Sequence, residues 1–183
     1  MKGHIHGLLA GGLYIICNYI ITNIPCWHIR KALYRLLGMK VGKGSRIMMK
    51  TIVTHPWKIK IGDNATINEY CYLDGRGGLS IGNNVNIALR SMLITGSHHT
   101  GSIAFDYYTE PIKIEDDVWL GSQSMVLNGC TIGHACIIGA GAVVQPRSHC
   151  EERSIYGGVP AKKIKERHLF DSLELSHWNI HFR

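Results

Sequence analysis

The C-terminal half of the chain places one apolar residue at every sixth position. The residues that lead these blocks are Ile114, Leu120, Val126, Ile132, Ile138, Val144, Cys150 and Tyr156. A period of six fits neither the 3.6-residue period of a helix nor plain strand alternation, but it fits short strands that are joined by turns and stacked as a coil. The pattern therefore predicts a mainly β protein, a parallel β-helix in which three blocks make one triangular coil.

A second regularity within each block supports this geometry. The fifth residue is small or compact, as in Val118, Ser124, Cys130, Cys136, Ala142, Ser148, Ser154 and Pro160. If positions one and five both point inward, bulky and small side chains alternate and fill a narrow interior. Glycine often follows the leading residue, as at Gly121 and Gly139, where the backbone must turn tightly or approach a neighbour.

The same register continues upstream, with one long interruption. The leading residues there are Ile61, Ile67 and Leu73, then Ile81, Ile87 and Leu93, with Val41 and Ile47 as candidates for an earlier coil. A two-residue insertion falls within Gly75–Gly78, and the repeat breaks over residues 94–113, which include His98 and His99. A loop of this length in a compact domain is usually functional or disordered. We expect a β-helix over residues 41–160 with an excursion loop at 94–113.

The two ends of the chain leave the repeat. Residues 8–24 are mostly apolar, but as a helix they would reach about 26 Å, short of a bilayer core of about 30 Å. Residues 27–37 have the pattern of a short amphipathic helix. We expect residues 1–40 to be helical, and two interpretations stay open: peripheral membrane contact, or packing against the β-helix or another subunit. Residues 161–183 are predicted to form a basic helical segment that covers the last coil.

Composition narrows the partners. The formal net charge of +7 favours anionic partners such as phosphorylated cofactors or lipid headgroups. The basic residues are scattered without an aromatic-interleaved stripe, so nucleic acid is not an expected partner. Four of the six cysteines, Cys71, Cys130, Cys136 and Cys150, fall on inward positions, as expected for small core residues in a reducing compartment. A cytoplasmic protein is expected, with association to the inner face of the membrane as the open alternative.

Four sequence runs carry a resemblance to a known family. They are Thr95–His98 (TGSH), Ile114–Ser122 (IEDDVWLGS), Ile138–Val144 (IGAGAVV) and Gly157–Ile164 (GGVPAKKI). The chain resembles the hexapeptide-repeat O-acetyltransferases, and within them the branch beside maltose and galactoside acetyltransferases that modifies bacterial surface polysaccharides such as colanic acid, capsule or O-antigen. The resemblance implies a left-handed β-helix, a homotrimer with active sites between subunits, and acetyl transfer from acetyl-CoA without a required metal.

The resemblance also assigns residues around the acceptor. By motif position, His98 is the family's catalytic histidine, and an imidazole suits the task of deprotonating a sugar hydroxyl as it attacks a thioester. His99 is the fallback base. Asn68 and Asp74 match the region that meets the acceptor and orients the reacting groups. Each also has a purely structural interpretation, Asn68 in a turn of the coil and Asp74 as a cap of the glycine-rich bend.

For the coenzyme, the resemblance points to the later blocks. Ser122 and Ala140 match positions whose backbone lines the pantetheine channel. Lys162 and Lys165 match basic positions near the nucleotide phosphates, where cations are physically sensible. The chain departs from the family's Thr-Lys pair by having Gln145 and Pro146, and Arg147, one step further on, is the substitute phosphate ligand.

The function that the resemblance implies is acetyl transfer to a sugar hydroxyl of a bacterial surface polysaccharide or its precursor. Three other function classes are alternatives. One is an N-acetyltransferase acting on an amino sugar, and another is a non-catalytic β-helix scaffold. A γ-type carbonic anhydrase shares the fold but needs three zinc-binding histidines. It is disfavoured because, with His134 as the second ligand, the position expected for the third histidine is Gly139.

Overall fold

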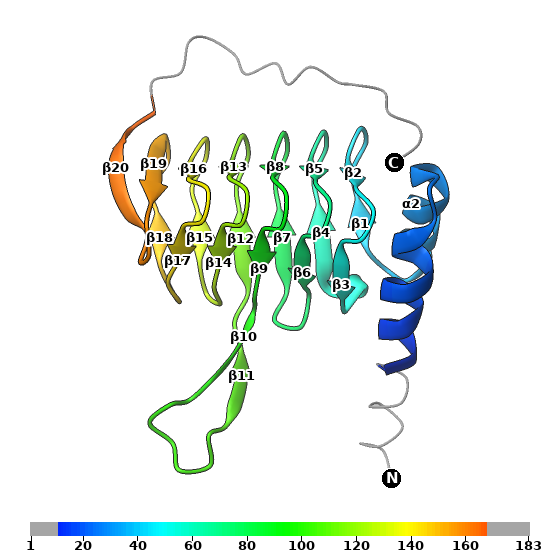
Figure 1. Ribbon diagram of the computed structural model, residues 1–183, viewed down its shortest axis with the longest axis horizontal. Helices are drawn as coiled ribbons and strands as arrows, with labels where there is room; N and C mark the ends of the chain where they lie inside the picture. Colours follow the sequence, from blue (N-terminus) through cyan, green and yellow to red (C-terminus); the bar gives the residue numbers. More distant parts are fainter. Residues whose placement is uncertain (1–10, 168–183) are drawn as a thin grey trace.

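The computed structural model describes residues 11–167, and its main body is a three-sided prism of stacked coils (Figure 1). The first parallel sheet contains β1 (Lys40–Val41), β4 (Ile59–Ile61), β7 (Leu79–Ile81), β12 (Ile112–Ile114), β15 (Thr131–Ile132) and β18 (His149–Cys150). The second contains β2 (Arg46–Ile47), β5 (Thr66–Ile67), β8 (Asn86–Ile87), β13 (Trp119–Leu120), β16 (Ile137–Ile138) and β19 (Ser154–Gly157). The third contains β3 (Ile52–Thr54), β6 (Tyr72–Asp74), β9 (Met92–Leu93), β14 (Met125–Val126) and β17 (Val143–Val144). The predicted parallel β-helix is confirmed.

The interior of the prism holds the residues that lead the blocks. They are buried from Val41 through Cys150, and equivalent leaders stack on one another, as Ile81 on Ile114 and Ile114 on Ile132. Val53, which the repeat count did not include, completes the first coil and is fully buried. The four inward cysteines are also buried, as expected. The regularity fades at the last coil, because Tyr156 is only half-buried and Pro160 is exposed.

The turns between strands depend on the fourth residue of each block, which the sequence pattern had not indicated. That residue has a left-handed backbone with φ between 48° and 75° at Gly44, Lys50, Asn64, Tyr70, Asn84, Arg90, Asp117, Gln123, Gly129, Ala135, Gly141, Arg147 and Arg153. Glycine at the second position serves close approach instead. A Cβ at Gly121 would lie 2.5 Å from the backbone nitrogen of Ala140 on the next coil, so only glycine lets these coils stack.

The N-terminal segment covers the open end of the first coil. It comprises a helical turn at residues 11–15, η1 (Ile16–Ile20), η2 (Ile21–Asn23) and α2 (Trp27–Leu36). The Asn18 side chain pairs with the terminal edge of β3: its NH₂ group donates to the Val53 carbonyl at 2.9 Å, and its oxygen accepts from the Val53 N–H at 2.7 Å. The buried Arg30 guanidinium donates to the Ile47 carbonyl at 3.0 Å. The cap thus satisfies backbone groups that a terminal coil would leave unpaired.

The C-terminal segment differs from the prediction. Residues 162–166 form a strand, β20 (Lys162–Glu166), which pairs antiparallel with β19, and not the start of a helix. The reason is the unpaired edge of β19: the Gly157–Pro160 turn reverses the chain so that β20 hydrogen-bonds to that edge and closes the second sheet. The rest of the predicted helix, residues 168–183, lies outside the described residues. Within residues 11–167, no helix has both the length and the apolar character needed to span a bilayer.

Candidate active site

Three excursions leave the prism at one edge, where the third sheet passes into the first. They are η3 (Pro56–Lys58) between β3 and β4, the bend at residues 75–78 between β6 and β7, and the long loop between β9 and β12. Because β3, β6 and β9 are neighbours in one sheet and β4, β7 and β12 in the next, the excursions lie on successive coils of the same edge (Figure 1). The sequence repeat indicates the bend at residues 75–78 and the long loop, but it does not indicate η3.

His98 lies on the long loop, which projects from the prism as a hairpin of β10 (Gly96–His98) and β11 (Tyr107–Thr109) (Figure 1). Its Nδ1 lies 2.8 Å from the carbonyl oxygen of Phe105, and its ring stacks on the Phe105 ring with centroids 4.5 Å apart. A carbonyl oxygen can only accept, so Nδ1 carries the proton and Nε2 of the neutral ring keeps a free lone pair. The geometry therefore prepares Nε2 to accept a proton.

A buried carboxylate fastens the base of this loop. Asp74 Oδ2 accepts a hydrogen bond from the Thr95 backbone N–H at 3.0 Å, and Arg76 binds both carboxylate oxygens, at 2.8 and 2.9 Å. Burial opposes ionisation of Asp74, but these hydrogen bonds outweigh it and hold its pKa well below the usual range. Asp74 Oδ1 also accepts from the Arg76 backbone N–H at 3.0 Å, so Asp74 caps the glycine-rich bend as in its structural interpretation. The Thr95 bond in addition connects it to the histidine loop.

Arg76 and Tyr107 connect this anchor to the histidine. The Arg76 guanidinium lies 5.5 Å from the centroid of the Tyr107 ring, and Tyr107 meets the His98 ring edge-on with centroids 5.3 Å apart. Tyr107 fits there because residue 96 is glycine: a Cβ at Gly96 would lie 2.3 Å from the Tyr107 hydroxyl. Neither Tyr107 nor Arg76 is among the site residues that the sequence predicts.

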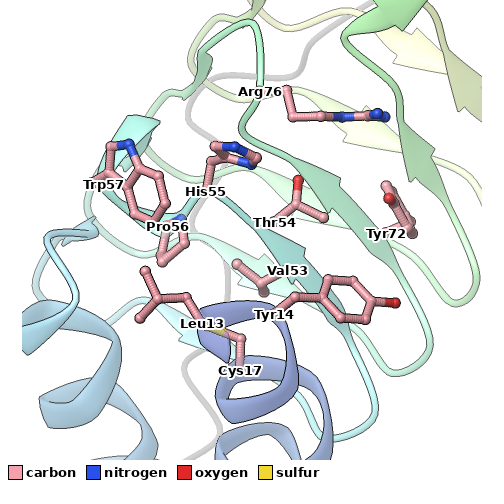
Figure 2. Close-up of a pocket in the computed structure, with 10 residues that line it drawn as sticks. All are labelled: Leu13, Tyr14, Cys17, Val53, Thr54, His55, Pro56, Trp57, Tyr72 and Arg76. Atoms are coloured by element: carbon pink, nitrogen blue, oxygen red, sulfur yellow. The ribbon is translucent and has the colours of Figure 1, made fainter. Parts of the chain in front are cut away.

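A pocket of about 250 Å³ opens at the same edge, between the excursions and the N-terminal helical segment (Figure 2). Its lining combines apolar and polar side chains: Leu13, Tyr14, Cys17, Val53, Thr54, His55, Pro56, Trp57, Tyr72 and Arg76. His55 has a left-handed backbone with φ of 49°, and its buried Nδ1 has no hydrogen-bond partner. Burial and the nearby Lys58 lower its pKa. His55 was not among the residues predicted from the sequence, since nothing in the repeat marks it.

The other two residues predicted near the acceptor, His99 and Asn68, lie at different edges of the prism. His99 stacks on Tyr108 with ring centroids 4.2 Å apart, and both border an open depression with His98 and Arg147. Asn68 lies at a different edge, after β5, where it donates to the Ile87 carbonyl at 2.9 Å. Asn68 thus occupies a turn of the coil, as its structural interpretation expects. Within one chain it does not lie near His98.

The predicted coenzyme residues follow a second edge. Ser122 and Ala140 are exposed on the turns after β13 and β16, and the adjacent Gly141 N–H donates to the Ser122 carbonyl at 2.9 Å. Lys162 and Lys165 are exposed on β20, which extends the second sheet. Arg147 is separate from them: it lies at the histidine's edge, ion-paired with Glu110 at 2.8 Å. One chain therefore carries its histidine and most of its predicted coenzyme residues on different edges.

The fold and this loop together define a class of protein, the hexapeptide-repeat β-helix transferases. A family model described as "Bacterial transferase hexapeptide (six repeats)" matches residues 111–146. A relative in Escherichia coli, named "Putative colanic acid biosynthesis acetyltransferase WcaF", is 35% identical over 138 residues, covering 75% of each chain. The galactoside O-acetyltransferase of the same species is 30% identical, covering 75% of this chain and 68% of its own.

Solved structures agree with these sequence matches. The crystal structure of a hexapeptide-repeat acetyltransferase from Vibrio cholerae, in complex with acetyl-CoA, superposes with a TM-score of 0.76 at 29% identity and covers 87% of this chain and 85% of that one. The chain belongs to the hexapeptide-repeat acetyltransferases, and its parallel β-helix is the fold that the six-residue repeat predicts. It is an enzyme of the acyltransferase class, and acetyl-CoA is the coenzyme bound by its structural neighbour.

Proposed function

We propose that this chain transfers the acetyl group of acetyl-CoA to a hydroxyl of a sugar in a bacterial surface polysaccharide or its precursor, with His98 as the general base. The observation that carries the proposal is the bond from His98 Nδ1 to the Phe105 carbonyl, which in the neutral ring selects the tautomer with a free Nε2 lone pair, while stacking on Phe105 holds the ring. Relatives whose names include colanic acid and lipopolysaccharide biosynthesis support the choice of acceptor class.

The proposed reaction is direct transfer. His98 Nε2 removes the proton of the acceptor hydroxyl as its oxygen attacks the thioester carbonyl, and a backbone N–H stabilises the resulting oxyanion. The carbon–sulfur bond then breaks, and the imidazolium returns its proton to the leaving thiolate, which yields CoA and the acetyl ester. The Phe105 carbonyl stabilises the transient positive charge on the ring through Nδ1. Asp74 acts as a positioning residue, because both its oxygens are already occupied by Arg76 and Thr95.

We further propose a homotrimer in which the histidine edge of one subunit faces the coenzyme edge of its neighbour. The separation of His98 from Ser122 and Ala140 within one chain supports this arrangement. Exposed Lys162 and Lys165 are then available to the phosphates of CoA, with Arg147 as a further cation on the histidine side. Asn68, which lies away from its own His98, is proposed to face the acceptor of a neighbouring site.

The decisive test measures CoA release with acetyl-CoA and a panel of sugar acceptors. His98→Ala is expected to lower kcat by about 10²–10⁴-fold, the usual contribution of a general base. His149→Ala, an exposed histidine on the first sheet, is the matched control and is expected to retain full activity. If His99→Ala abolishes turnover and His98→Ala does not, the assignment of the base is wrong. Product analysis distinguishes ester from amide and so tests O-transfer against N-transfer.

The intersubunit site has its own test. Neither His98→Ala nor Ala140→Trp, which fills the coenzyme edge, is expected to be active alone. Co-expressed, they form mixed assemblies in which some sites combine an intact histidine with an intact neighbouring coenzyme edge, so activity is expected to return. Continued inactivity in mixed assemblies of demonstrated composition would place both elements of each site in a single chain.

A further inference from the structure

We infer that the N-terminal cap of the prism is a docking surface for an anionic lipid bilayer. The cap is defined here as residues 11–37 together with the first coil, residues 38–62. It closes one end of the prism, and β20 lies at the other end (Figure 1). The inference goes beyond acetyl transfer and does not depend on which acceptor is used.

Charge is distributed very unevenly along the chain. Residues 1–62 contain ten of the twenty Lys and Arg residues and none of the thirteen Asp and Glu residues, the first acidic residue being Asp63. The remaining 121 residues therefore have a formal charge of −3, although the whole chain has +7. The exposed cations of the cap are Arg35, Lys40, Lys43, Lys50, Lys58 and Lys60. Such a one-sided basic surface attracts anionic lipid headgroups.

The same cap exposes large apolar side chains. Along residues 11–20, Ile15 is 55% exposed, Tyr19 69% and Ile20 56%, while Cys17 and Ile21 from the same segment are buried. On α2, Leu36 is 82% exposed beside the exposed Arg35. These helices bury one face on the first coil and expose apolar side chains on the other. Basic side chains lie beside them, Arg35 next to Leu36 on α2 and Lys50 in contact with Asn23 at the end of η2. Exposed apolar side chains with basic neighbours are typical of a helix that lies in a membrane interface.

An anionic bilayer fits this surface better than a second copy of the chain. A symmetric contact between two caps would bring like charges together, because residues 1–62 contain no carboxylate and the next one, Asp63, already accepts a bond from the Lys43 backbone N–H. An anionic bilayer can take up the aliphatic and tyrosine side chains in its interfacial region, and its headgroups neutralise the lysines. The edge pocket takes Leu13 and Tyr14 from this same helical segment, so docking would bring the pocket next to the headgroup region.

The experiment is flotation of the full-length protein with vesicles of phosphatidylcholine alone or mixed with phosphatidylglycerol. Binding is expected only to the mixed vesicles and is expected to weaken with salt. Ile20→Ser is expected to lower the partition coefficient at least about tenfold, by removal of one apolar side chain that enters the bilayer. Lys43→Gln is expected to lower it about fivefold, the usual contribution of one basic residue near an anionic surface.

The matched controls lie at the other end of the prism. Val159→Ser removes an apolar side chain that is 73% exposed, and Arg153→Gln removes an exposed charge on the last coil. Both are expected to bind vesicles as the wild type does. Equal binding by cap and control variants, or no preference for phosphatidylglycerol, would overturn the inference. So would light scattering that shows dissociation of the oligomer by Ile20→Ser, since the apolar face would then be a subunit contact.

Discussion

Substitution of Asp74 by asparagine tests whether a buried carboxylate holds the histidine loop in place. The side chain is fully buried and accepts five hydrogen bonds: from the Thr54 hydroxyl, from the Arg76 backbone and two guanidinium nitrogens, and from the Thr95 N–H. An amide turns one acceptor oxygen into a donor that faces other donors. Removal of one partner of a buried ion pair costs about 3–5 kcal/mol. Because Arg76 is 36% exposed and regains water, we expect a loss near the lower limit, about 3 kcal/mol.

The assay is denaturant unfolding of wild type and Asp74→Asn as a function of pH. The pKa of Asp74 is lowered in the folded protein, whereas an unfolded aspartate has a pKa of about 3.9. Its stabilisation is therefore fully present above that value and is lost as the pH falls through the folded-state pKa. The difference in unfolding free energy between the two proteins is expected to be constant near neutrality and to shrink in acid.

Two further variants make the result interpretable. Asp106→Asn changes an exposed carboxylate on the same loop and is expected to alter stability by less than about 0.5 kcal/mol. Arg76→Met leaves the carboxylate buried without its partner, and the double variant is expected to be less destabilised than the sum of the single changes. A loss below about 1 kcal/mol for Asp74→Asn, or a loss that does not change with acid, would refute the reasoning.

Three other changes test the fold and the coenzyme side. Gly121→Ala is expected to cost about 3 kcal/mol, the upper end of the usual overpacking cost, since its Cβ meets backbone atoms of the next coil. Gly141→Ala, with open space around it, should cost only the strain of a left-handed backbone, about 1–2 kcal/mol. Thermal unfolding that ranks Gly141→Ala as the worse would contradict the packing argument. Asn18→Ala is expected to lose about 2 kcal/mol by leaving both polar groups of a strand edge unpaired. Little change is expected for Asn23→Ala, because its side chain bonds at the surface, donating to the Tyr19 carbonyl and accepting from Lys50. Arg147→Ala should raise the KM for acetyl-CoA without lowering the melting temperature, because its ion pair is exposed; an unchanged KM would remove it from the coenzyme site.

The sequence by itself determined the coil. A six-residue period predicts a coil that buries every leading residue, so the buried leading residues from Val41 to Cys150, with the exception of Val53, could be predicted from the sequence. The excursion that carries His98 was equally evident, because it interrupts the period. The signal is local and repeated, and repetition makes it reliable.

Only the tertiary structure decided what lies beside what. Stacking brings the His55 excursion, which nothing in the repeat marks, to the same edge as the Asp74 bend and the histidine loop. It also decides which side chains of that edge touch, as Arg76 with Tyr107 and Tyr107 with His98. Pairing with an unpaired strand edge turned residues 162–166 into a strand despite their helical pattern, because a free edge offers hydrogen bonds that an isolated helix turn does not. The separation of His98 from Ser122 and Ala140 is likewise a property of the prism, since which edge a residue occupies depends on how the coils are closed in space.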